Sequence, residues 1–221
     1  MLLQIAGVNH NDPLCRSRLI DWLKSLSTTR TTLPSFIAVE AAEQFYLSLL
    51  PQREVLRQLI VDEFPAVSSD VLDVLVASIY YEADTHKETF PESRVVWLDS
   101  ATRTHRRSLD SYAKDRMVMY RPHLAYGDAL ARISEWAWSF GWERPPTTPL
   151  GDPDYNRDFR FYEKIKDAIS SQDGDWAIVI VGSSHAAIRT NSMKQLLKQD
   201  GVSCVVEILK PSQVEQKRKL G

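Results

Sequence analysis

The sequence lacks an excess of charge of either sign, and it lacks any long hydrophobic run. Its 27 Lys and Arg residues nearly balance 29 Asp and Glu residues, which leaves a net charge of −2. Proteins that hold nucleic acid are usually clearly basic, so we expect no nucleic-acid partner. No apolar run approaches the roughly 20 residues needed to cross a bilayer, and no basic segment precedes the apolar residues 2–7. We therefore predict no membrane span and no signal peptide.

Cysteine and glycine are also scarce. The two cysteines, Cys15 and Cys204, are far apart and neither belongs to a Cys-x-x-Cys pair, so we expect two inert thiols and no zinc knuckle. Such thiols are typical of a cytoplasmic protein. Among only 8 glycines, Gly7 and Gly182 stand at the ends of apolar runs, where glycine lets a chain leave a sheet tightly.

The sequence does contain a regular alternation of apolar and amphipathic segments. Five apolar runs are predicted as strands, at residues 2–7, 34–40, 92–99, 175–182 and 201–209. Apolar residues at helical spacing predict helices between them, at residues 14–26, 47–64, 69–81, about 106–119, 125–140, 155–171 and 186–198. This alternation predicts an α/β fold with a mainly parallel central sheet and helices on both faces.

The length of the chain fits one domain. With 221 residues, it is long enough for one sizeable core and short for two. We predict a single α/β domain over residues 1–212, with a helical insertion at about 104–171 before the fourth strand and a polar tail at 213–221. Residues 141–153 are rich in proline and glycine, which predicts a loop or a lid.

Functional side chains follow four of the five predicted strands. His10, Glu40, Asp99 and His185 each stand at or just beyond a strand end. In open α/β sheets, ligands bind beyond the carboxyl ends of the strands, so we expect these side chains to share one site. The two histidines occur in one format, Gly-Val-Asn-His10 and Gly-Ser-Ser-His185.

Two imidazoles and one or two carboxylates are suited to two kinds of chemistry. They can hold a divalent metal with an open position, which then acidifies a bound water. One histidine can instead act as a general base without metal, oriented by Glu40 or Asp99. A structural interpretation also exists, because histidines at strand ends cap helices and bind loop carbonyls. Spacing alone does not separate these alternatives, since the residues come from different strands.

Three further polar residues have alternative interpretations. Arg157 offers a planar fork of donors to a substrate carboxylate or oxyanion, or else it forms a surface ion pair with Asp158 or Glu163. Glu82 can accept a hydrogen bond from a site histidine. His86 shares no helix face with the acidic residue two positions before it, so we predict that it lies at the surface.

In their order along the chain, these motifs resemble those of the TraB/Tiki superfamily, which is related to the erythromycin esterases and the ChaN haem-binding proteins. The resemblance covers roughly residues 3–207. Its pieces are Gly-Val-Asn-His10, Phe-Ile-Ala-Val-Glu40, Tyr-Glu82-Ala, Val-Val-Trp-Leu-Asp99, Asn-Arg157-Asp and Val-Ile-Val-Gly-Ser-Ser-His185. Two positions depart from the pattern: Asn156 stands where the family has Glu, and Ser100 stands where it often has Arg.

The resemblance implies a hydrolase that cleaves an amide or ester bond in a peptide or small-molecule substrate. His10, Glu40 and His185 would be catalytic and would bind Mn²⁺, Co²⁺ or Zn²⁺, while Arg157 would stabilise an oxyanion. ChaN-type members bind haem iron and need not be enzymes, so a haem-, metal- or small-ligand-binding protein is the alternative. The resemblance leaves the oligomeric state open. The supporting residues that it implies are Glu82, Asp99 and Arg107.

Overall fold

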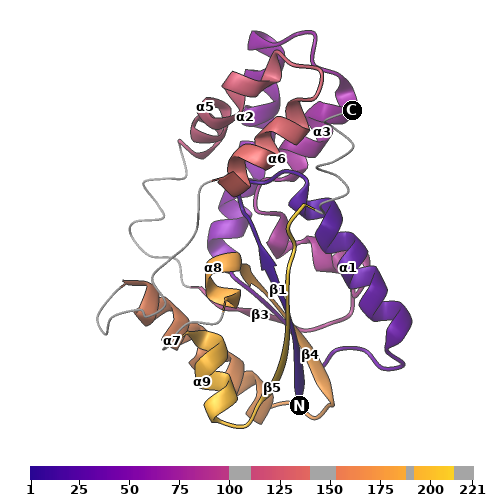
Figure 1. Cartoon of the computed structure of the whole chain (residues 1–221), viewed down its shortest axis with the longest axis vertical. Helices are drawn as coiled ribbons and strands as arrows, with labels where there is room; N and C mark the ends of the chain where they lie inside the picture. Colours follow the sequence, from indigo (N-terminus) through magenta and orange to yellow (C-terminus); the bar gives the residue numbers. More distant parts are fainter. Residues whose placement is uncertain (100–110, 140–152, 188–191, 212–221) are drawn as a thin grey trace.

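A parallel sheet lies at the centre of the protein. A computed structural model describes residues 1–99, 111–139, 153–187 and 192–211, with side chains in the third range from residue 157 onward. Within these ranges, five strands form one sheet in the order β3-β2-β4-β1-β5, and every neighbouring pair is parallel (Figure 1). The strands are β1 (Leu2–Val8), β2 (Ile37–Val39), β3 (Val95–Trp97), β4 (Trp176–Gly182) and β5 (Ser203–Ile208). The predicted α/β fold class is confirmed.

The predicted strands are all present, but four of them are shorter than expected. β2 and β3 have three residues each, although their apolar runs are longer. The extra apolar residues, such as Phe36 before β2 and Leu98 after β3, are buried without belonging to a strand. The length of an apolar run therefore predicts which residues are buried, and the buried residues extend beyond the last hydrogen bond between strands. The longest strands, β1 and β4, are buried along almost their whole length and pair from Leu2↔Trp176 to Val8↔Gly182.

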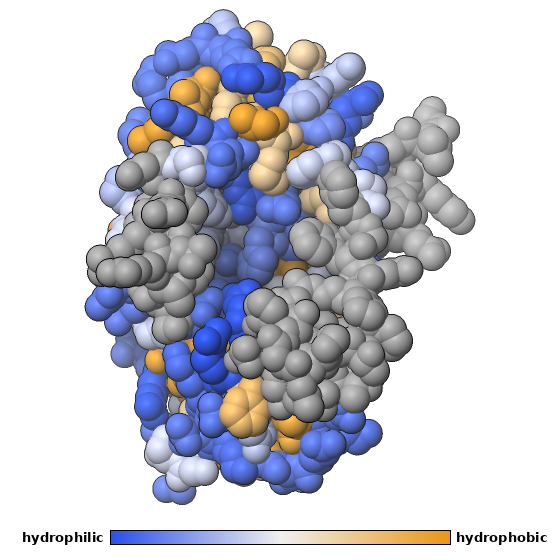
Figure 2. All heavy atoms as spheres, turned by 90° about the vertical axis from the view of Figure 1, so that its left-hand side faces the viewer, coloured by the Kyte–Doolittle hydropathy of each residue, from blue (hydrophilic) through white to orange (hydrophobic). Residues whose placement is uncertain are grey.

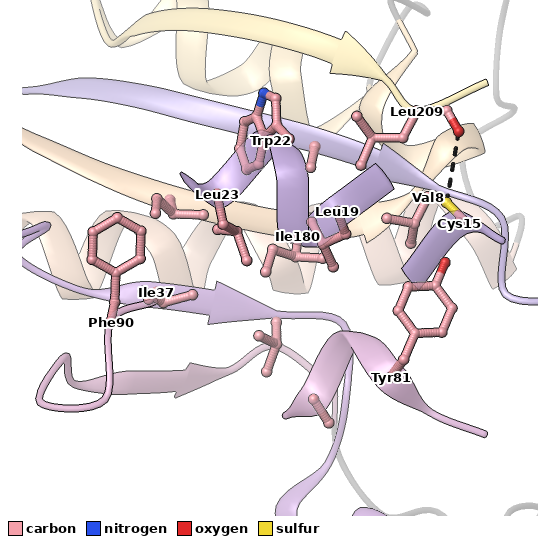
Figure 3. Packing of buried hydrophobic residues seen from close by; sticks show 14 of the residues in the cluster. Val8, Cys15, Leu19, Trp22, Leu23, Ile37, Tyr81, Phe90, Ile180 and Leu209 are labelled. Atoms are coloured by element: carbon pink, nitrogen blue, oxygen red, sulfur yellow. Dashed lines mark hydrogen bonds between the residues drawn. The ribbon is translucent and has the colours of Figure 1, made fainter. Parts of the chain in front are cut away.

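Helix α1 (Cys15–Thr29) covers one face of the sheet. Its buried residues Leu19, Trp22 and Leu23 belong to a core cluster with side chains of β1, β2 and β4, including Ile37 and Ile180 (Figure 3). At the edge of this cluster, the Sγ atom of Cys15 donates to the carbonyl oxygen of Leu209 across 3.7 Å. Both cysteines are free, and burial raises the pKa of Cys15 to about 11, as expected for an inert thiol.

Three helices pack on the opposite face. They are α7 (Pro153–Ser170), α8 (Ser183–Ala186) and α9 (Met193–Gln199). Phe161 and Ile165 of α7, with Met193 and Leu197 of α9, share a second core cluster with the strand residues that alternate with those facing α1. Helices therefore cover both faces of the sheet, as the alternating pattern predicts.

The remaining helices form a cluster of their own beyond the sheet (Figure 1). This helical cluster contains α2 (Glu43–Glu63), α3 (Ser69–Ala77), α5 (Tyr112–Leu124) and α6 (Ala129–Ser139), which share a separate apolar core. Of the helices predicted within residues 104–171, α5 and α6 thus join α2 and α3, while α7 lies on the sheet. Figure 2 shows the side that carries α5 and α7, where the described surface is hollowed and hydrophilic across the middle.

Two helix boundaries differ from the prediction and matter for the site. The helix expected at 69–81 ends at Ala77, and Tyr80 adopts a left-handed conformation with φ 54°. Two short 3-10 helices follow, η1 (Tyr81–Ala83) and η2 (Thr85–Glu88), which position Glu82. The helix expected at 186–198 is divided into two. Helix α8 begins at Ser183, directly after β4, and ends at Ala186, and α9 begins at Met193. The expected loop at 141–153 lies outside the described residues except for Pro153, which begins α7.

Within the described ranges, no helix combines the length and the apolar character that a membrane span needs.

Candidate functional site

Side chains from every part of the predicted motif set meet at the carboxyl edge of the sheet. His10 follows β1 by two residues, Glu40 directly follows β2, Asp99 follows β3, and His185 lies in α8 after β4. A pocket of about 170 Å³ opens here, lined by both histidines, Glu40, Arg157, Asn11 and Ser183 among others. The expectation that parallel strands deliver these groups to one place is therefore met for the described residues.

Glu40 lies at the centre of the site and is almost fully buried. Its Oε1 atom accepts a hydrogen bond from Nη2 of Arg157 at 2.8 Å, and its Oε2 atom accepts one from the backbone N–H of Gly182. The two imidazoles face this carboxylate from two sides. Nε2 of His185 lies 3.6 Å from Oε1, and Nε2 of His10 lies 3.7 Å from Oε2.

Each histidine is held from behind by a second carboxylate. Nδ1 of His185 donates to Oδ1 of Asp158 at 2.7 Å, and the side chains of both residues are almost completely buried. Nδ1 of His10 lies 3.0 Å from Oε1 of Glu82, whose side chain is 1% exposed. A carboxylate accepts but does not donate, so Asp158 holds the proton on Nδ1 of His185 and leaves its Nε2 facing the pocket, while Glu82 acts on His10 through its charge. Glu82 thus has the supporting position that the sequence predicts.

Gly182 makes this convergence possible. A Cβ atom at this position would lie 3.0 Å from Nε2 of His10 and 3.1 Å from Oε2 of Glu40. Its φ of −53° is one that any residue adopts. The glycine is therefore needed for the close approach of side chains and not for a special turn, which corrects the reason inferred from the sequence.

Arg157 links two strand ends. Its Nη2 atom donates to Glu40 and also to Oδ2 of Asp99 at 2.7 Å. The guanidinium lies over the ring of Phe161, 5.2 Å from its centroid. The alternative of a surface ion pair with Asp158 or Glu163 is wrong, because α7 turns Arg157 toward the site. Asp99 joins the site through Arg157.

The charges in the site are strongly coupled. Burial disfavours the charged form of His10, but the negative charges of Glu82 and Glu40 outweigh it and raise the pKa of His10 to about 10. Burial also disfavours the charge of Glu40, yet His185, His10 and Arg157 outweigh it and hold the pKa of Glu40 well below its usual range. At neutral pH the site therefore contains an ionised Glu40 beside a protonated His10.

The donor set has the chemistry of a divalent-cation site. Two histidine Nε2 atoms and one carboxylate are the ligands of many catalytic zinc centres, and each Nδ1 has the outer carboxylate partner common in such centres. Among the described residues, however, no group of three His, Cys, Asp or Glu side chains is arranged to hold a metal ion. The two Nε2 atoms face different oxygens of Glu40, which are also engaged by Arg157 and Gly182.

Sequence reasoning missed Asp158 as a site residue. It belongs to the Asn-Arg-Asp piece of the resemblance, but the sequence suggests it only as a surface partner of Arg157, because adjacent residues on a helix usually point in different directions. His86 is the second error, because the structure buries it to 1% exposure and not at the surface. Arg107 and Ser100 lie outside the described residues, as does the side chain of Asn156.

Comparison with known proteins adds no relative. No family model, no curated protein and no solved structure matches the chain.

Proposed function

We propose that the protein is a hydrolase of the TraB/Tiki type that cleaves an ester or amide bond. One observation carries this proposal: two histidines, each backed by a carboxylate, face a single glutamate at the ligand-binding edge of a parallel sheet. A purely structural role explains one buried His–Asp pair, but it does not explain two such pairs converging on a third carboxylate in a pocket.

In this proposal, His185 is the general base. Asp158 fixes the proton on Nδ1, so Nε2 accepts a proton from a water that attacks the scissile carbonyl carbon. His10, held protonated by Glu82 and Glu40, then donates a proton to the leaving group. Arg157 uses one nitrogen on Glu40 and Asp99, which leaves its other N–H groups to stabilise the oxyanion.

The size of the pocket favours a small reacting group. The described residues enclose about 170 Å³, below the roughly 300–1,000 Å³ typical of sites that engulf a drug-sized ligand. This size supports a substrate whose peptide bond or small ester enters from the surface. It does not support a haem held within the pocket. The two free thiols support a cytoplasmic location for the proposed enzyme.

A bound Mn²⁺, Co²⁺ or Zn²⁺ would be held by His10, Glu40 and His185. When bound, such an ion supplies an acidified water at neutral pH. Loading would require His10 to release its proton, because the nitrogen that binds a metal must be unprotonated. It would also require Glu40 to exchange its contact with Arg157 for the ion. Metal uptake should therefore release a proton and increase with pH.

Alanine variants of the two histidines test the proposal. The wild type, His10→Ala, His185→Ala and the double variant are assayed on 4-nitrophenyl esters and fluorogenic peptides. His123→Ala, on α5 with its ring against Trp136, is the matched control. We expect turnover in the wild type and the control, and none in the other variants. Full activity in both single variants would contradict the proposal.

Metal content separates the two forms of the mechanism. Protein purified without an affinity metal is analysed for metal and then titrated with Mn²⁺, Co²⁺ and Zn²⁺, in the wild type and the double histidine variant. Near-stoichiometric metal that is lost in the double variant supports a metal-dependent hydrolase. Turnover that survives a chelator supports the metal-free mechanism. Metal or haem uptake with no turnover on any substrate supports the binding-protein alternative.

A further inference from the structure

Arg116 is the only buried arginine among the described residues. It lies on α5, in the helical cluster, and only 6% of its surface is exposed. Its Nη1 atom donates to Oδ1 of Asn11 at 3.0 Å, and its Nη2 atom donates to the hydroxyl of Tyr112 at 2.8 Å. Both acceptors are neutral, so these two hydrogen bonds do not balance the charge of the guanidinium.

Other partly buried arginines in the described chain have a carboxylate partner. Arg18 pairs with Asp12, Arg53 pairs with Asp84 at 2.8 Å, and Arg157 pairs with Glu40 and Asp99. Arg116, the most buried of these arginines, has no carboxylate within 4 Å in the described ranges. Glu82 is the carboxylate whose charge reaches Arg116, but Glu82 itself contacts His10. A buried cation without an adjacent anion is costly, and most buried charges in proteins are paired.

The position of Arg116 connects it to the candidate site. Asn11, its hydrogen-bond partner, lines the pocket next to His10. Because Oδ1 of Asn11 accepts from Arg116, the amide nitrogen of Asn11 remains available as a donor in a residue that lines the pocket. Nη1 and Nη2 of Arg116 are engaged by the hydrogen bonds to Asn11 and Tyr112, and Nε is not among the sealed polar atoms without a partner, so Nε keeps access to solvent; Asn11, and not Arg116, lines the pocket itself.

We propose that Arg116 and Asn11 form an anion subsite that binds a carboxylate of the substrate. The substrate of the proposed hydrolase would then be an ester or amide with a carboxylate close to the scissile bond. A guanidinium suits this task because its planar N–H groups match the two oxygens of a carboxylate. The kinetic consequence of this inference rests on the proposed hydrolase function. The binding of an anion by Arg116 and Asn11 does not depend on that function.

The kinetic test compares monomethyl succinate, which carries a carboxylate, with the neutral dimethyl succinate, by pH-stat titration. We expect the wild type to prefer the anionic ester in kcat/KM and Arg116→Gln to reduce that preference about tenfold or more. Arg116→Lys, which keeps the charge, should recover part of the preference. Arg121→Gln is the matched control, because Arg121 lies on the same helix in an exposed pair with Glu63. An unchanged preference in Arg116→Gln would overturn the subsite.

Calorimetry with succinate makes the subsite testable without turnover. We expect succinate to bind the wild type and His185→Ala and to bind Arg116→Gln at least tenfold more weakly. If neither ester is hydrolysed while succinate binds in this pattern, the hydrolase proposal fails and the anion subsite stands. If Arg116→Gln does not fold, Asn11→Ala replaces it in both assays with the same expected losses. A wild type that neither binds succinate nor prefers the anionic ester overturns the inference, whatever the variants do.

Discussion

The turn after β1 and the turn after β4 place a histidine three residues beyond a glycine, yet they build different environments. His185 lies in α8, is 2% exposed and contacts the fully buried Asp158. His10 lies in a loop, is 36% exposed and contacts Glu82 from a 3-10 helix. The same spacing thus yields one rigid histidine and one histidine at the open side of the pocket. The two motifs are alike, so the difference comes from the residues around each ring: Asp158 contacts the ring of His185, and Glu82 contacts the ring of His10.

The two glycines differ in the same way. Gly182 is small so that His10 and Glu40 can approach β4. Gly7 is small so that Ile208 of β5 and helix α8 can pack against β1, since a Cβ there would lie 2.3 Å from Cδ1 of Ile208, 2.9 Å from Cβ of Ala186 and 3.2 Å from Cα of Ser183. One glycine therefore serves the site and the other serves the fold. The four predictions below test these distinctions, from the largest expected effect to the smallest.

Removing the charge behind His185 should have the largest effect. In Asp158→Asn, the amide no longer holds the proton on Nδ1, so Nε2 ceases to be a reliable base. We expect kcat on the best ester or peptide substrate to fall about 10⁴-fold, the order seen when such a carboxylate is replaced. Circular dichroism verifies the fold. A loss under tenfold in folded protein would remove His185 from the role of base.

The two glycines should separate activity from stability. In Gly182→Ala, the displaced His10 and Glu40 should reduce kcat/KM about 10²-fold with little change in stability. In Gly7→Ala, crowding against Ala186 and Ser183 should lower the free energy of unfolding by about 1–3 kcal/mol while folded protein stays active. Gly127→Ala is the control, because nothing lies within 4 Å of its Cβ position. Similar effects of both substitutions on activity would contradict the distinction.

The proton on His10 should depend on Glu82. Because the pKa of His10 is raised to about 10, its contribution to stability is fully present below pH 6.5 and is lost as pH rises through about 10. In Glu82→Gln, the pKa of His10 should fall toward 6.5, and the alkaline limit of activity should move with it. NMR titration of the imidazole measures the pKa without any substrate. A midpoint of about 6.5 in the wild type would contradict this electrostatic picture.

His86 shows what burial does to a histidine whose ring contacts no carboxylate, and its effect should be the smallest. Both ring nitrogens are buried without a hydrogen-bond partner, and burial lowers the pKa of His86 to about 4. The unfolded chain therefore takes up a proton first, and stability decreases as pH falls from 6.5 toward 4. His86→Leu should remove about 1–2 kcal/mol of this loss at pH 5. Urea unfolding at pH 7 and pH 5 measures the decrease in the free energy of unfolding between the two pH values. An equal decrease in the wild type and in His86→Leu would exclude His86 as its source.

Much of the site could be predicted from the sequence because parallel strands end at one edge. His10, Glu40, Asp99 and His185 were found by asking which side chains follow apolar runs, and the fold brings all four strand ends together. Asp158, Asn11 and Arg116 gave no such signal. Asp158 and Arg116 lie on helices whose orientation depends on packing, and Asn11 matters only through the helix that packs against its loop.

The sequence by itself determined the class of fold and the edge at which the polar groups gather, because periodicity of apolar residues dictates both. Only the tertiary structure decided the partner of each charge. Glu82 came to His10 because α3 ends at Ala77 and Tyr80, in its left-handed conformation, precedes a 3-10 helix. Arg157 came to Glu40 because α7 packs on the sheet. Such pairings join residues that are 27 to 117 positions apart in the chain. These pairings depend on how the helices pack against the sheet, which the spacing of residues along the sequence does not predict.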